Sequence, residues 1–215
     1  LHYTALVAMF YAMLGVVLSD GGFSFLFFWE LMTVASFLLI LFDAQRREVR
    51  RAALSYLIMM HIGFVLLVIG FVRLDAACGA ATFGALGDYF RTQPGLPLRL
   101  VFLAGFGMKA GLFPMHVWLP EAHPAAPSHV SALMSGVMIK TGVYGILRVT
   151  AALGEQPLLH TAGVILLAAG VVTGLWGVIL AAMQNDVKRL LAYSSIEHVG
   201  VILIGLGVAA LGKSS

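Results

Sequence analysis

The chain has few charged residues. Only 11% of its 215 residues are Asp, Glu, Lys or Arg, whereas a soluble domain has roughly 25%. Hydrophobic residues make up 60% of the chain, and its mean hydropathy is +0.97. This composition excludes an ordinary soluble domain and predicts an integral membrane protein with the lipid bilayer as a partner. The net charge of +3 is small and lies mostly in loops, so it indicates orientation and no nucleic-acid partner.

Cysteine and the common cofactor motifs are also scarce. The single cysteine, Cys78, excludes a disulfide within one chain and any cysteine-ligated cluster. No GxGxxG or Walker sequence occurs, so nucleotide binding has no support. The HExxH signature is absent, and the spacing of His116, His123 and His129 matches no compact ligand pattern. We therefore expect neither a metal nor a cofactor in this chain.

Long apolar runs fill the rest of the sequence. A membrane-spanning helix needs about 20 mostly apolar residues, and six or seven such segments can be marked. They are Tyr3–Leu18, Phe23–Phe42, Ala52–Val72, Leu96–Met115, Ser131–Thr150, Ala162–Met183 and Leu190–Leu211. These segments predict an all-α fold, a polytopic transmembrane helical bundle in a single domain over residues 1–215. Because both ends lie in or beside apolar runs, we expect the chain to be a fragment of a larger subunit.

The fourth apolar segment runs into a proline-rich stretch. Proline removes a backbone donor and disrupts an α-helix, so we expect a discontinuous helix. Non-helical backbone at membrane depth is tolerated only inside protein or beside a water-filled cavity, which places the break inside the bundle. The segment Ala125–Leu133 is expected to re-enter as a short half-helix. The residues expected to break the helix are Pro114, Pro120, Pro124 and Pro127.

Basic residues gather in two short loops, 43–51 and 184–189. Four crossings separate these loops if the broken segment crosses once, and an even number places both on the same side of the membrane. The positive-inside rule then places both loops on the cytoplasmic side, and we expect the protein to lie in the inner membrane of the cell. The polar stretch Arg73–Leu98 falls on the opposite side, with a short surface helix expected at Ala81–Phe90. The basic residues are Arg46, Arg47, Arg50, Arg51, Lys188 and Arg189.

Three ionisable residues lie near the middle of predicted spans: Glu30, Lys109 and Lys140. A charge at mid-depth costs about 2.5–3.5 kcal/mol on insertion scales, so such residues usually face a partner or a water-filled path. A Glu30–Lys109 pair would keep both groups charged, and a second charge moving close would release the lysine's proton. In this hypothesis the proton released by Lys109 passes next to Lys140. The alternatives are a structural Glu30 pair, a snorkelling Lys109, and a Lys140 paired with a carboxylate elsewhere in the protein.

Three further polar residues are candidate relays. His61 lies mid-helix, and a lone histidine there is either a hydrogen-bonded core residue or a proton relay. Glu197 and His198 are neighbours near mid-depth, about 100° apart around a helix, so they cannot share one partner closely. Either could begin another hydrophilic path. Haem ligation by His61 and His198 has no other support in the sequence.

Four motifs carry a resemblance to a known family. They are Gly-Phe-Gly-Met-Lys-Ala-Gly-Leu-Phe-Pro-Met-His-Val-Trp-Leu-Pro-Glu-Ala-His-Pro-Ala-Ala-Pro-Ser at 105–128, Met-Ile-Lys-Thr-Gly-Val-Tyr-Gly at 138–145, Trp-Glu at 29–30 and Asp-Val-Lys-Arg-Leu-Leu-Ala-Tyr-Ser-Ser at 186–195. With them the chain resembles the antiporter-like membrane subunits of respiratory complex I, Mrp cation/proton antiporters and membrane-bound hydrogenases. The form Glu121-Ala122-His123 looks most like the hydrogenase-4 and formate hydrogenlyase branch, since complex I subunits more often have Asp-Ala-His.

The resemblance implies a proton-translocating module of about fourteen helices, built from two inverted five-helix repeats. This chain would begin at the fourth helix and stop within the tenth, and a second broken helix would follow it. Glu30, Lys109 and Lys140 match the family's proton-pathway positions, and His61 and His198 fall where the family often has polar residues.

The function implied is that of a non-catalytic pump subunit in a redox-driven complex. It would carry no redox centre, and its partners would be other membrane subunits and peripheral redox subunits. The alternative is an Mrp-type monovalent cation/proton antiporter subunit. A third class, an enzyme such as a quinone reductase or an intramembrane protease, lacks the necessary site residues in this sequence.

Overall fold

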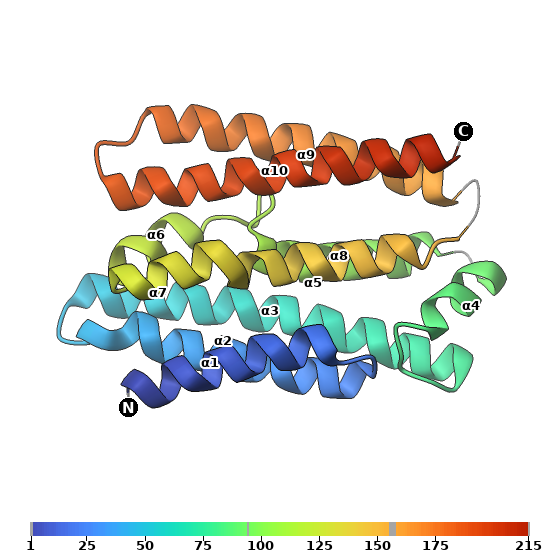
Figure 1. Cartoon of the computed structure of the whole chain (residues 1–215), viewed down its shortest axis with the longest axis horizontal. Coiled ribbons are helices and arrows are strands. Elements are labelled where there is room, and N and C mark those ends of the chain that lie inside the picture. Colours follow the sequence, from blue (N-terminus) through green and yellow to red (C-terminus); the bar gives the residue numbers. More distant parts are fainter. Residues whose placement is uncertain (1, 94, 155–157, 215) are drawn as a thin grey trace.

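Helices are the main elements of the described part of the chain. The computed structural model describes residues 2–93, 95–154 and 158–214, and apart from one isolated β-bridge, Gly21 with Thr82, its elements are helices. The prediction of an all-α polytopic bundle is confirmed (Figure 1). The helices are α1 His2–Leu18, α2 Gly22–Ile40, α3 Arg47–Cys78, α4 Ala85–Thr92, α5 Leu96–Ala110, α6 Leu119–Ala125, α7 Ser128–Leu133, α8 Ile139–Ala151, α9 Leu158–Ala182 and α10 Val187–Ser214, with a 3-10 turn at Leu41–Asp43 and a π-helical segment at Met134–Met138.

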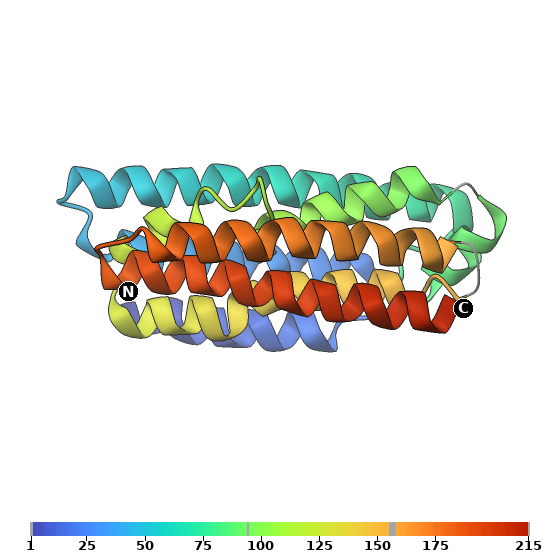
Figure 2. The same cartoon turned by 90° about the horizontal axis from the view of Figure 1, so that it is seen from above.

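Every predicted apolar segment overlaps one or more of these helices. Within the described residues, five helices are long and apolar enough to cross a membrane, and α1 is a shorter apolar helix. A further crossing is made in two pieces by α5 and α6. The helices run side by side along the long axis of the molecule, which gives the elongated bundle seen from above in Figure 2.

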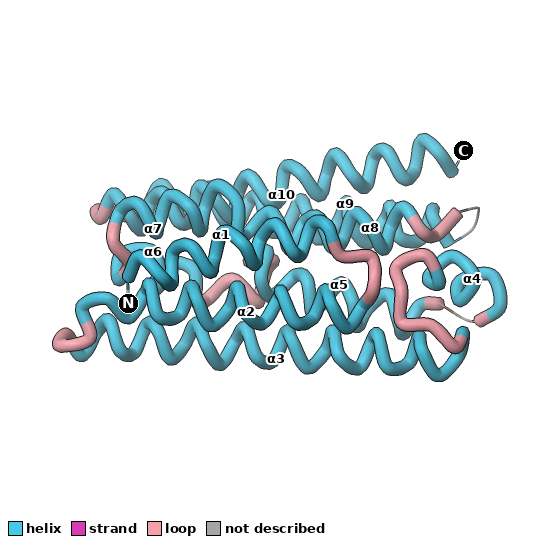
Figure 3. Tube along the Cα trace, turned by 60° about the horizontal axis from the view of Figure 1, so that its bottom comes forward, coloured by secondary structure: helices cyan, strands magenta, loops and turns pink. Residues whose placement is uncertain are grey.

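The break in the helix lies in the middle of the bundle, as Figure 3 shows, but its second half-helix is not where the sequence suggested. The prediction of a half-helix at Ala125–Leu133 is wrong, because the half-helix is α6 and residues from Ser128 onward begin the next span. Pro120 lies in the first turn of α6, where a backbone N–H has no intrahelical partner and proline is tolerated. A proline therefore begins this helix rather than ending it.

The two basic loops lie at the same end of the bundle (Figure 1). Arg46 and Arg51, from the first loop and the start of α3, line one surface hollow together with Arg189 from the second loop. The prediction that both loops lie at the same end is thereby confirmed. The long polar stretch lies at the opposite end and contains one short helix, α4, close to the one predicted.

The helices α9 and α10 are in backbone contact along their length. A Cβ atom added at Gly200 would lie 2.6 Å from the Cα atom of Gly174 and 2.8 Å from the carbonyl oxygen of Gly170. A Cβ atom added at Gly177 would lie 2.7 Å from the amide nitrogen of Glu197. Small residues permit this close approach, which is the usual way that membrane helices pack without a hydrophobic driving force between them.

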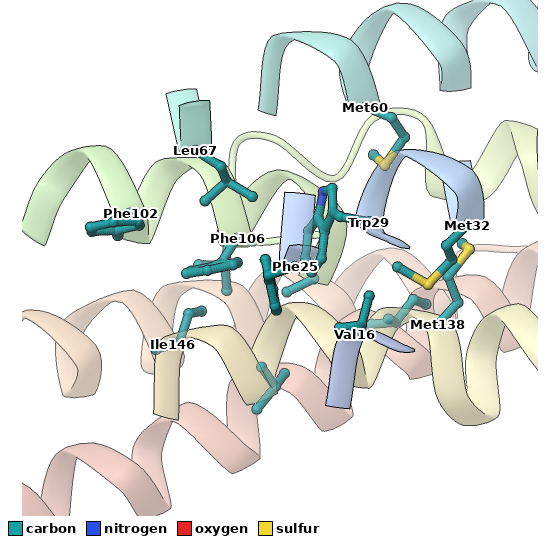
Figure 4. Close-up of a cluster of buried hydrophobic side chains, with 14 of the residues drawn as sticks. Val16, Phe25, Trp29, Met32, Met60, Leu67, Phe102, Phe106, Met138 and Ile146 are labelled. Atoms are coloured by element: carbon teal, nitrogen blue, oxygen red, sulfur yellow. The ribbon is translucent and has the colours of Figure 1, made fainter. Parts of the chain in front are cut away.

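An aromatic cluster joins α2 to α5 beside the break (Figure 4). Phe25 and Trp29 of α2 stack with ring centroids 5.3 Å apart, and Trp29 meets Phe106 of α5 edge-on at 5.4 Å. Phe102 stacks on Phe106 at 5.9 Å. All four side chains are buried. The cluster fixes the rotation of α2 against α5 and so determines which side chains meet one turn further along.

We expect Gly200→Ala to destabilise the full-length subunit by about 1–3 kcal/mol, because the new methyl group would meet the backbone of α9. The measurement is the thermal unfolding midpoint in detergent. The matched control is Gly205→Ala on the same helix, where the added Cβ has nothing within 4 Å. Equal midpoints for the two variants would contradict the backbone contact between α9 and α10.

Candidate functional site

Lys109 is buried in the last turn of α5. Its side chain is 1% exposed, its Nζ donates to the hydroxyl of Thr33 at 2.9 Å, and the Nζ lies 4.5 Å from the centroid of the Trp29 ring. The helix ends at Gly111, which has φ of +77° and donates its N–H to the carbonyl of Gly107. The carbonyls exposed at this helix end favour a nearby positive charge. A hydroxyl, an aromatic face and a helix C-terminus thus replace water around the ammonium.

Glu30 does not form the predicted ion pair with Lys109. Its Oε1 lies 3.1 Å from Nε2 of His61, and no carboxylate in the described part of the chain lies within 4.0 Å of the lysine Nζ. The other carboxylate oxygen, Oε2, has no hydrogen-bond partner there. Thr33, three residues after Glu30 on the same face of α2, occupies the place expected for the carboxylate.

Two hydrogen bonds hold the link between α5 and α6, one to α9 and one between the link and the end of α5. The N–H of Phe113 donates to Oγ1 of Thr173 on α9 at 3.2 Å, and the indole of Trp118 donates to the carbonyl of Met108 at 2.9 Å. These bonds satisfy backbone groups that the interrupted helix leaves unpaired, as a membrane interior requires. The four prolines have different positions: Pro114 lies in the link, Pro120 and Pro124 lie within α6, and Pro127 is the residue before α7.

Lys140 follows the π-helical segment in the next span. Its Nζ donates to the carbonyl oxygen of Ser135 at 2.6 Å. The hydroxyl of Ser135 in turn lies 2.5 Å from that of Ser195 on α10. Because a π-helical turn changes the backbone hydrogen-bond register, a carbonyl at mid-span becomes available to the ammonium. Lys140 is half-buried and, like Lys109, lies beside an irregularity in its helix.

The two lysines lie on helices whose backbones touch. A Cβ atom added at Gly142 would lie 2.7 Å from the amide nitrogen of Ala110 and 2.7 Å from the carbonyl of Phe106. Gly142 is two residues after Lys140, and Ala110 is the residue after Lys109. The lack of a side chain at Gly142 therefore brings α8 against α5 close to the two residues that carry the ammonium groups.

A polar hollow connects Lys140 with one end of the bundle. Its lining comes from α6, α7, the π-helical segment, α8 and α10. Lys188, at the start of α10, also lines it and donates to the carbonyl of Ala126 at 2.8 Å. Because Lys188 is at the end that holds the basic loops, the hollow reaches from that end to the depth of Lys140. The polar residues of the lining are His123, Ser128, Ser131, Ser135, Lys140, Lys188, Ser194, Ser195 and His198.

His123 is the residue of this hollow that sequence reasoning missed, because the sequence raised it only as a metal ligand. The side chain is 1% exposed, its Nδ1 lies 2.7 Å from the hydroxyl of Ser131, and its Nε2 has no partner in the described residues. The serines at 131 and 135, one helical turn apart on one face, are the signal in the sequence that marks this polar surface.

The candidate relays fall in separate places. His61 contacts Glu30, and its Nδ1 is 2.9 Å from the carbonyl of Leu57. His198 lines the polar hollow, with its Nδ1 2.6 Å from the carbonyl of Ser194. Glu197 is not among the residues that line that hollow. The neighbouring pair at 197–198 is thus divided between two faces of α10, as the 100° rotation per residue predicts.

We expect Lys109→Met to keep or raise the stability of the full-length subunit, by up to about 4 kcal/mol, because it removes a buried charge and keeps the volume. Lys109→Ala should lower stability by about 2–5 kcal/mol, because it leaves a cavity beside Trp29. Thermal unfolding midpoints of both variants in detergent test this contrast. A large loss of stability in Lys109→Met would mean that the ammonium is a structural group.

The chain is similar to known membrane proteins along most of its length. Residues 19–214 match the family model described as "NADH:quinone oxidoreductase/Mrp antiporter, TM". The chain is 41% identical over 211 residues to a protein of Escherichia coli K12 named hydrogenase-4 component B, and the match covers 94% of this chain. It covers 30% of that relative's length.

Two solved structures resemble the fold closely. One is the membrane-bound sulfane sulfur reductase, an archaeal respiratory membrane complex, with a TM-score of 0.84 and 34% identity, where the match covers 96% of this chain and 35% of the other. The second is the Mrp complex from Dietzia sp., with a TM-score of 0.87 and 27% identity, where the match covers 96% of this chain and 23% of the other. The chain thus spans about a third or less of the length of each of these relatives.

Proposed function

Because the chain belongs to the NADH:quinone oxidoreductase/Mrp antiporter transmembrane family, we propose that it is part of a proton-translocating subunit of a redox-driven membrane complex. The observation that carries the proposal is the environment of Lys109. Its ammonium is buried at mid-span, and no carboxylate of the described residues lies within 4.0 Å of it. An intramembrane cation without a counter-ion is costly, which favours a functional reason for its presence.

The proton would move along groups that the helix irregularities bring together. Lys109 would exchange its proton with Lys140 across the contact of α5 with α8, where Gly142 lies against Ala110. Lys140 would then communicate with one end of the bundle through the polar hollow. His123, whose Nε2 has no partner in the described part of the chain, lies on that route and supplies a ring nitrogen that can accept or donate a proton.

Glu30 would control the proton affinity of Lys109. It now contacts His61, and its second oxygen has no partner among the described residues. A carboxylate that moves from His61 toward the lysine stabilises the ammonium form, and one that moves away favours release of the proton. Electron transfer elsewhere in the complex would bias this movement. In this proposal the Glu30 carboxylate has two alternative partners, His61 and Lys109.

The subunit would work in a larger assembly. Hydrogenase-4 component B, at 41% identity, favours the hydrogenase branch, with other membrane subunits and peripheral redox subunits as partners. The protein would lie in the inner membrane, and the positive-inside rule would place the basic loops 43–51 and 184–189 on its cytoplasmic side. We expect no redox centre in this chain, and the redox centres of the complex would belong to its partners.

A second candidate function is an Mrp-type monovalent cation/proton antiporter subunit. The fold similarity to the Mrp complex, with a TM-score of 0.87, favours it. The genes beside the full reading frame separate the two functions, since hydrogenase subunits support the first and a set of small antiporter subunits supports the second. In membrane vesicles, proton uptake driven by an electron donor supports the first, and proton movement driven only by an added Na⁺ or K⁺ gradient supports the second.

We expect Lys109→Met in the complete complex to lower coupled proton translocation by at least about tenfold, because the transferring group is gone. Proton uptake by inverted membrane vesicles, followed with a ΔpH-sensitive dye, is the measurement. Lys213→Met, an exposed lysine on α10, is the control and should pump normally. Full coupled pumping by Lys109→Met would refute the central role of this lysine.

Thr33→Val should lower pumping severalfold while leaving the subunit folded, because the ammonium loses its hydroxyl acceptor. Thr92→Val is the matched control, since that exposed hydroxyl donates to the carbonyls of Asp88 and Tyr89 in its own helix. The same vesicle assay compares the two variants. Equal rates in both would show that Thr33 has no part in the path.

A further inference from the structure

An apolar cavity lies between α5, α8 and α9, away from the polar hollow. Two of its lining residues have polar side chains, Arg99 and Thr150, and Thr150 directs its hydroxyl to the carbonyl of Ile146. The cavity is a narrow slot with a volume of about 40 Å³. Its lining is Arg99, Leu100, Phe102, Leu103, Phe106, Ile146, Val149, Thr150, Leu153, Ala162, Ile165 and Leu166.

The slot runs from the end of the bundle opposite the basic loops into the membrane. Arg99 lies in the first turns of α5, Leu153 follows the end of α8, and Ala162 lies in the first turns of α9, all at that end. From Arg99 to Phe106 the lining extends roughly 10 Å along α5, at 1.5 Å per residue. The slot therefore has one mouth near the membrane surface and a hydrophobic inner part.

The mouth carries a buried guanidinium that has no counter-ion among the described residues. Arg99 is 8% exposed, its Nη1 donates to the carbonyl of Leu158 at 2.8 Å, and its Nε donates to the carbonyl of Gly95 at 3.3 Å. Within residues 2–93, 95–154 and 158–214, no carboxylate lies within 4.0 Å of it, and its Nη2 has no hydrogen-bond partner. A buried arginine is normally paired with an anion, because the charge is expensive to desolvate.

The charge and the slot together fit one kind of occupant. An apolar cavity does not hold ordered water, because its walls offer no hydrogen bonds. An acyl chain that leaves the bilayer for this slot gains no hydrophobic free energy, but it gains van der Waals contacts with the apolar walls. A phosphodiester suits the guanidinium, whose planar array of N–H donors binds two oxygens at once. The molecule with both parts, at this depth, is a membrane phospholipid.

We propose that this slot is a phospholipid-binding site, with one acyl chain between α5, α8 and α9 and the phosphate on the Arg99 guanidinium. The bound lipid would fill the gap beside α9, and it would bind whether or not protons move through the polar hollow. The proposal is thus independent of the proposed function.

The experiment uses the full-length subunit in its complex, reconstituted with a phospholipid that carries a photoreactive diazirine in its acyl chain. After illumination, labelled peptides are identified by mass spectrometry, and tightly bound phospholipid is counted by native mass spectrometry after detergent washing. Wild type should be labelled within 99–106, 146–153 or 162–166 and should retain one phospholipid at this site. Labelling by the acyl chain distinguishes a lipid from free phosphate, which carries no such group.

Two pairs of variants test the two halves of the site. Arg99→Gln should lower labelling of these segments by about tenfold or more, because it removes a charge-assisted contact, whereas Arg91→Gln, an exposed arginine at the same end, should not. Ala162→Leu should block the slot, whereas Ala168→Leu, exposed on the same helix, should not.

Unchanged labelling and lipid retention in both Arg99→Gln and Ala162→Leu would overturn the proposal. So would wild type that retains no phospholipid, or a slot found to be filled by another segment of the subunit or by a neighbouring protein.

Discussion

The structure depends on the burial of an ammonium group in a bundle whose described residues offer it no carboxylate at contact distance. Lys109 is accommodated because α5 ends beside it, because Trp29 presents its ring and because Thr33 supplies a hydroxyl. The aromatic cluster positions the Trp29 ring. Thr173 of α9 accepts a hydrogen bond from the backbone N–H of Phe113, after the break. The irregular link is tolerated at membrane depth only because α9 provides a partner for it. The buried charge of Lys109, the break after α5 and the packing of α2 and α9 therefore depend on one another.

Most of the fold could be predicted from the sequence. Apolar runs long enough to cross a bilayer leave few alternatives, so the positions and the order of the long helices follow from the sequence. The common side of the two basic loops follows once the broken segment is taken as a single crossing. The position of the second half-helix could not be predicted, because proline both disrupts a helix and begins one. Pro114 does the first and Pro120 the second, and only the surrounding contacts decide between these roles.

The site could be predicted in part. Glu30, Lys109 and Lys140 stand out because charge is rare inside a span, and the motifs around them indicated a family that the comparison over residues 19–214 confirms. Their partners could not be predicted. The contact of Glu30 with His61 and that of Lys109 with Thr33 join different helices, and a single sequence gives no relative rotation of two helices. His123 was missed for the same reason, since its role depends on Ser131 and on the hollow shared with α10.

The π-helical segment at Met134–Met138 has a geometric consequence for everything that follows it. Such a segment holds one residue more than the α-helical turn it replaces. If it relaxed to regular α-helix while α7 stayed in place, α8 would turn by about 100° about its axis. Lys140 would swing away from the Ser135 carbonyl, and Gly142 would leave Ala110. A change of backbone register in this one segment would therefore separate the residues now in contact between α5 and α8 by rotating α8, without a break in the helix.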